Sequence, residues 1–175
     1  MRRFLSALAL VLLPALAAPA LHAQGGAGLQ PRFGVGLEAV GTLPGQSIVA
    51  PGFGLGLRGR IALPLNADLS AALGSGFVGY VFQGQDDASY LFNPQASLIV
   101  TIPTGARAKY VLGGIGGFVP LSADDESDGG FALHLGLGWA RPLSETSTFF
   151  EINPSLIIGE RASTPVLTAR FGVIF

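Results

Sequence analysis

Charged side chains recur at alternate positions in several apolar stretches, where they could form ion pairs or bind anions. In each stretch, one alternating set is apolar, and the other combines charge with glycine or small residues. Successive side chains of a β-strand point to opposite faces, so we expect the charges to share one face. The predicted inward polar set is Glu38, Arg58, Arg60, Arg107, Lys109, His134, Glu151 and Arg170.

This set allows two interpretations. A lone buried ion is very costly, so enclosed charges are expected to pair, with Arg170 placed between Glu38 and Glu151. The five cations outnumber the two anions, and this excess would suit a lining selective for small anions. We favour a structural network of ion pairs, because a small closed sheet is only wide enough to hold its own side chains.

His134 and one acidic segment are the remaining candidates for chemistry. A serine two residues along the same strand would give a His/Ser pair, but that position is Gly136, and we therefore expect no enzyme activity. Asp124, Glu126 and Asp128 alternate before Gly129 like the start of a calcium loop. The glutamate expected at the twelfth position of such a loop is Leu135. We predict a solvated external loop, with no metal and no cofactor.

The alternating pattern predicts eight strands, each long enough to cross the hydrocarbon layer of a membrane when tilted. The expected ranges are 32–42, 53–63, 69–81, 90–102, 106–118, 131–141, 148–158 and 167–175. Within 106–118, we expect Arg107 and Lys109 to point inward, and Tyr110 and Leu112 to point outward. Pro94 and Pro154 cannot donate to a sheet ladder, so a bulge or local break is expected at each.

The connections predict an up-and-down meander. Pro64, Pro103 and Pro142 mark short turns 39 residues apart, and longer polar segments lie between them. Alternating short and long connections are typical of a barrel with a tight periplasmic end and a looser external end. A soluble lipocalin-like barrel is the alternative, but its polar face would be outside, whereas here charge and glycine share the predicted inner face.

The chain ends favour export to a membrane. Residues 1–23 have a basic head, an apolar middle and small residues before a cleavage site after Ala23, which is typical of a signal peptide. A second site at 18–20 and a retained anchor are alternatives. Residues 24–31 would form a short lead, and residues 32–175 the barrel. The chain has no cysteine, which excludes a lipoprotein anchor and disulfides.

Composition gives no indication of a nucleic-acid partner, and we expect none. Removing Arg2 and Arg3 from the ten basic residues leaves eight, against eleven acidic residues, a net charge of −3. The chain is 49% hydrophobic with 26 glycines, but the part after residue 23 has no long apolar run. Hydrophobicity spread over alternating strands suits a β-barrel in a membrane.

The last strand also carries a candidate assembly signal. Phe175, Val173 and Phe171 share one face and end the chain on an aromatic residue. This resembles the C-terminal signature of bacterial outer-membrane β-barrel proteins. Together with the eight strands and proline turns, the chain resembles the small eight-stranded barrels of the OmpX and OmpA membrane-domain type.

That resemblance has several implications. It implies an all-β, eight-stranded antiparallel transmembrane barrel in the cell outer membrane, with outer-membrane lipids and the barrel assembly machinery as partners. It implies a structural or surface-interaction role, with an unidentified external ligand and a monomeric state. Small lipid A deacylases share this location, but the His/Ser pair that they use is absent. A narrow, anion-preferring porin is the alternative function.

Overall fold

The structure is a computed structural model that describes residues 30–43, 52–82, 88–104, 107–121, 130–159 and 163–175. The predicted signal peptide and most of the lead 24–31 lie outside these residues, and the predicted division of the chain stays a prediction. None of the described residues forms a helix long and apolar enough to cross a bilayer.

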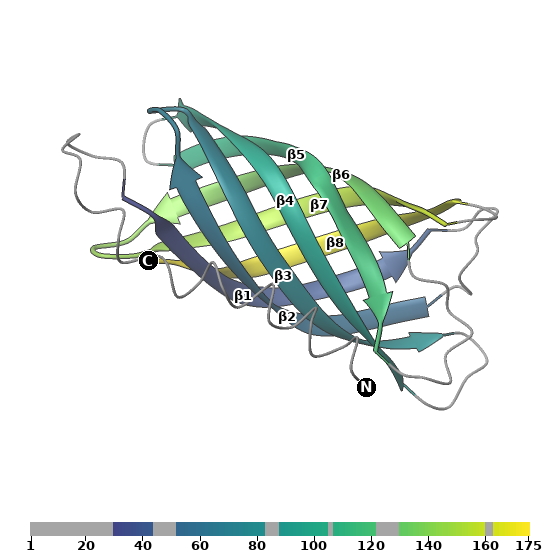
Figure 1. Cartoon of the computed structure of the whole chain (residues 1–175). Helices are drawn as coiled ribbons and strands as arrows, with labels where there is room; N and C mark the ends of the chain where they lie inside the picture. The colour runs from purple at the N-terminus through teal and green to yellow at the C-terminus, as the bar shows by residue number, and fades with distance from the viewer. Residues whose placement is uncertain (1–29, 44–51, 83–87, 105–106, 122–129, 160–162) are drawn as a thin grey trace, which may run out of the picture.

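Eight strands form a closed antiparallel barrel in which each strand pairs with its neighbours in the sequence (Figure 1). The strands are β1 (Arg32–Thr42), β2 (Gly52–Pro64), β3 (Leu69–Phe82), β4 (Ala88–Thr104), β5 (Arg107–Pro120), β6 (Gly130–Pro142), β7 (Ser147–Ile158) and β8 (Ser163–Ile174). The barrel closes between β1 and β8, where Phe33 and Phe175 exchange backbone hydrogen bonds of 3.2 and 2.7 Å. Closure leaves no free sheet edge. The predicted all-β eight-stranded barrel is confirmed.

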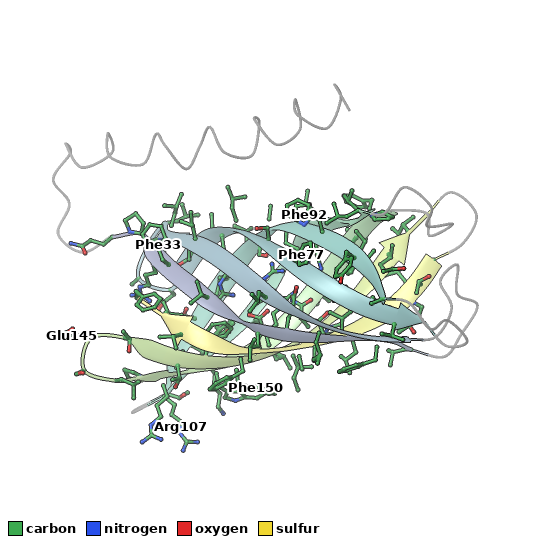
Figure 2. The ribbon with its side chains drawn as sticks, turned by 90° about the horizontal axis from the view of Figure 1, so that it is seen from below. Phe33, Phe77, Phe92, Arg107, Glu145 and Phe150 are labelled. Carbon is green, nitrogen blue, oxygen red and sulfur yellow. The ribbon has the colours of Figure 1, made fainter. Side chains whose placement is uncertain are left out.

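The outer surface of the barrel is apolar. Side chains at alternate positions of every strand are exposed, as Figure 2 shows for Phe33, Phe77 and Phe150. Large exposed apolar residues on a soluble protein would be a liability, whereas a lipid-facing band requires them. This pattern is the reverse of a soluble ligand-binding barrel.

The direction of side chains in β5 differs from the prediction. Tyr110 and Leu112 are buried inside the barrel, and Arg107 and Lys109 are exposed on its outside. The Tyr110 hydroxyl donates a hydrogen bond to the Glu151 carboxylate inside the barrel, which fixes the register of β5. A basic side chain close to a strand end can reach the polar boundary of a bilayer, so its charge does not force it inward.

The two ends of the barrel differ. The connections at residues 65–68, 105–106 and 143–146 join strands at the end where β1 begins and β8 ends. We call this the short-turn end. The connections at residues 43–51, 83–87, 121–129 and 159–162 lie at the opposite, long-loop end. Three of these four are longer than any connection at the short-turn end.

Side chains fill the lumen in layers. Near the long-loop end, inward side chains from seven strands pack into one apolar cluster, which we call the apolar layer. Its members are Val40, Val78, Tyr80, Leu91, Phe118, Ala132, Ile157 and Val166. Ala72, Ile99, Tyr110 and Leu112 form a second apolar cluster. Buried charged and neutral polar side chains occupy most of the interior outside these two clusters.

Candidate functional site in the barrel lumen

Arg170 is the central residue of the lumen network. It lies on β8 directly opposite Glu38 of β1 and Glu151 of β7 in the strand register. Its guanidinium donates through Nε to Glu38 Oε2 at 3.2 Å, and through Nη1 to Glu151 Oε1 at 2.5 Å. All three side chains are at most 3% exposed. Cross-strand pairing thus supplies the partners that buried charges require.

Two further cations extend this network from β2. Arg58 lies 3.6 Å from Glu38 Oε2 and donates a 2.6 Å hydrogen bond to Gln95 Oε1. Arg60 pairs with Glu151 Oε2 at 2.9 Å. The Arg60 guanidinium also lies 5.2 Å from the Phe149 ring centroid, within the range of a cation–π interaction.

Neutral side chains donate further hydrogen bonds to the Glu151 carboxylate. The Tyr110 hydroxyl donates to Glu151 Oε2 at 3.1 Å, and Asn153 Nδ2 donates to Glu151 Oε1 at 3.4 Å. Arg170 Nη2 donates to Gln95 Oε1 at 3.1 Å, so Gln95 accepts from both Arg58 and Arg170. The network therefore joins residues from β1, β2, β4, β5, β7 and β8.

Glycines on the inner wall provide the space for these side chains. A Cβ at Gly138 would overlap the Tyr110 ring, and a Cβ at Gly76 would overlap the Glu38 carboxylate. Gly138 lies directly opposite Tyr110 in the register. The inward glycines are thus needed for large side chains to fit in a narrow barrel.

The structure brings together five of the eight predicted inward residues: Glu38, Arg58, Arg60, Glu151 and Arg170. Arg107 and Lys109 were predicted in this set, and that prediction is wrong, because the register of β5 turns both to the outer surface. The network therefore holds three cations and two anions. This smaller excess of positive charge weakens the case for an anion-selective lining.

His134 is buried in the lumen, but it does not touch the charged network. Its Nε2 lies 2.9 Å from Ser97 Oγ, which projects from β4 across Gly114 of β5. Sequence analysis did not find this pair, because its members lie on different strands. Nδ1 of His134 has no hydrogen-bond partner among the described residues, so no third group orients the ring as a catalytic triad requires. We interpret the pair as an interior packing contact in which one ring nitrogen of His134 is hydrogen-bonded.

The other predicted residues fall at the ends of strands or outside the described part. Phe171 and Phe175 are exposed, and Val173 is half-buried next to them on β8. Asp124, Glu126 and Asp128 lie outside the described residues. Within the described part, no group of three or more histidine or acidic side chains could hold a metal ion.

No family model and no curated protein sequence matches the chain. Several solved structures, however, have a similar fold. Neisserial surface protein A superposes with a TM-score of 0.68 at 13% identity, and the match covers 84% of this chain and 97% of that one.

Two other solved barrels have the same architecture. The N-terminal barrel of OprF from Pseudomonas aeruginosa gives a TM-score of 0.50 at 18% identity, covering 83% of this chain and 100% of that one. The attachment invasion locus protein Ail of Yersinia pestis gives 0.52 at 13% identity, covering 83% and 97%. The chain therefore has the fold of the small eight-stranded outer-membrane β-barrels, the architecture indicated by its alternating strands and terminal phenylalanine.

Proposed function

We propose that this protein is a closed outer-membrane barrel with a structural or surface-interaction role and a lumen filled by its own side chains. The main supporting observation is the sequence of layers along the lumen. The apolar layer lies toward the long-loop end, and the ionic network occupies the interior beyond it. A wide aqueous channel needs a polar lining throughout, and eight strands do not leave room for one.

Location in the outer membrane is supported by the apolar outer surface and by the fold shared with three outer-membrane barrels. Ail is named for attachment and invasion. By analogy of fold alone, we propose that the long-loop end of this chain is the part that meets external partners. We propose that the barrel is monomeric and performs no enzymatic reaction.

The test is single-channel conductance of the mature protein refolded into a planar bilayer. A gel-mobility difference between heated and unheated samples first establishes that the barrel is folded. We expect no discrete conductance steps from the folded protein. Stable, anion-selective steps would contradict the closed lumen.

The alternative function, a narrow porin for small anions, is supported by the three guanidinium groups that face two carboxylates. It predicts steps whose anion preference falls in Arg58→Gln and Arg60→Gln. If neither the wild type nor the two variants give conductance steps, the narrow porin is contradicted and the closed barrel is supported.

A further inference from the structure

We propose that Arg107, Lys109 and Arg141 form a binding site for the phosphate of an anionic phospholipid headgroup on the outside of the barrel, at its short-turn end. We call these three residues and Trp139 the basic patch. All four are exposed on the outer surface of β5 and β6. Figure 2 shows Arg107 projecting away from the barrel wall, on the same side of the view as Phe150.

The strand register brings the patch together. Lys109 lies directly opposite Trp139, and Ala108 lies opposite Ala140. Arg107 and Arg141 each come one residue further toward the short-turn end than these alanines. Thr104, Arg107, Lys109 and Trp139 line an open pocket of about 450 Å³. Two of the three basic residues therefore border the same open depression as Trp139.

Nearby contacts hold the patch in place. Thr104 Oγ1 donates a 2.8 Å hydrogen bond to the carbonyl of Arg107, its partner in the register of β4 and β5. The Trp139 ring stacks on Phe150, with centroids 6.0 Å apart and planes at 26°. An anchored indole at a strand end is typical of the boundary between hydrocarbon and headgroups.

The charges of the patch have no protein partner in the described part of the chain. Every ion pair found there lies in the lumen, and none includes Arg107, Lys109 or Arg141. Lys109 is flanked across the strands by Ile102 and Trp139, so its ammonium group must extend toward the headgroup region. There, the anion supplied by the bilayer itself is the lipid phosphate, and basic residues near the membrane surface attract anionic lipids.

Trp139 is the only tryptophan of the chain, so its fluorescence reports the lipids next to the patch. The protein is refolded into phosphatidylcholine vesicles that contain phosphatidylglycerol, with bromine on the acyl chains of one lipid at a time. Bromine quenches the indole on contact. We expect brominated phosphatidylglycerol to quench more strongly than brominated phosphatidylcholine at equal mole fraction.

The quenching ratio gives a relative association constant. Each basic residue near a membrane surface contributes a preference of about fivefold for anionic lipid. In the triple variant Arg107→Gln, Lys109→Gln, Arg141→Gln, the ratio should fall to about one. Lys109→Gln alone should lower it less. The matched control is Arg32→Gln, an exposed cation at the same end on β1, four strands away from β5, and it should keep the wild-type ratio.

Equal quenching by both lipids in the wild type would overturn the proposal, and so would a preference that survives the triple variant. Inorganic phosphate should weaken the preference more than chloride of equal ionic strength does, because free phosphate competes for the same guanidinium and ammonium groups. The inference rests on the proposed membrane location. Failure to insert into vesicles would contradict that location, whereas a folded, inserted barrel with equal quenching would contradict only the lipid site.

Discussion

At the residue scale, Arg170 links the two buried carboxylates of the lumen. Replacing it with methionine keeps much of its length but leaves Glu38 and Glu151 without their shared partner. Removing one member of a buried ion pair typically costs about 3–5 kcal/mol, because the remaining charge stays desolvated. We expect Arg170→Met to lower the free energy of unfolding by about this amount, measured by urea titration in lipid vesicles.

The control for Arg170 is Arg32→Met. Arg32 is an exposed arginine at the start of β1, and surface substitutions of this kind usually change stability by less than about 0.5 kcal/mol. Equal stability of the two variants would show that the ion pairs of the lumen do not stabilise the fold.

Two glycines, Gly138 and Gly59, differ in the space that a larger side chain would find. A Cβ at Gly138 would overlap the Tyr110 ring, whereas a Cβ at Gly59 would meet nothing within 4 Å. Overpacking a filled interior costs about 1–3 kcal/mol. We therefore expect Gly138→Ala to lower the urea midpoint and Gly59→Ala to leave it nearly unchanged. A reversed order would contradict the placement of Tyr110 inside the barrel.

Tyr110 also shows which part of the site the sequence could not predict. Alternation placed Glu38, Arg58, Arg60, Glu151 and Arg170 on the inner face, because charge shared that face with glycine or polar residues and the opposite positions were apolar. In β5 both alternating sets contain apolar residues, and a glycine-rich stretch follows them. The hydroxyl of Tyr110 bonds to Glu151 from a distant strand, and no local pattern contains that information.

At the element scale, β8 closes the barrel and carries the proposed assembly signal. Phe175→Ala keeps the backbone hydrogen bonds to Phe33 and removes only an exposed ring. If the assembly machinery recognises this ring, folded protein in cells should fall several-fold, while refolding of the purified chain into vesicles stays within about twofold of wild type. Gel mobility of unheated samples measures both yields.

Phe33→Ala is the matched control for the assembly prediction. Phe33 is an exposed aromatic residue at the same end of the barrel, on the neighbouring strand β1. It should leave the yield in cells unchanged. Equal losses for the two variants would indicate a general need for aromatic residues at the membrane boundary, and would contradict a specific signal in β8.

Pro94 of β4 and Pro154 of β7 were predicted to cause a bulge or a local break in the strand pairing. Pairing of β4 with β5 is interrupted at Asn93 and Pro94, and pairing of β6 with β7 is interrupted opposite Asn153 and Pro154. The predicted local breaks are therefore present. The register is the same on both sides of each gap, so the structure contains no bulge there. Proline removes one donor, but both strands keep a continuous ladder on their other side.

At the scale of the whole molecule, the lumen contains two obstacles along one path. Phe118 and Leu91 belong to the apolar layer, and Glu151 and Arg170 belong to the ionic network. Obstacles in series act independently, because either one alone stops conduction. The ionic half of the lumen was partly visible in the sequence as an inward set. The apolar layer was not predicted, because its members come one or two from each strand and meet only when the sheet closes.

This arrangement predicts that opening the lumen requires changes in both layers. The double variant Phe118→Ala, Leu91→Ala should give no conductance steps in a planar bilayer, because the ionic network still fills the interior. The double variant Glu151→Gln, Arg170→Gln should also give no conductance steps, because the apolar layer is intact. The four substitutions together should give discrete conductance steps, provided that gel mobility shows a folded barrel. Steps from the ionic variant alone would mean that the apolar layer is no barrier, and the network by itself would then account for the closed state.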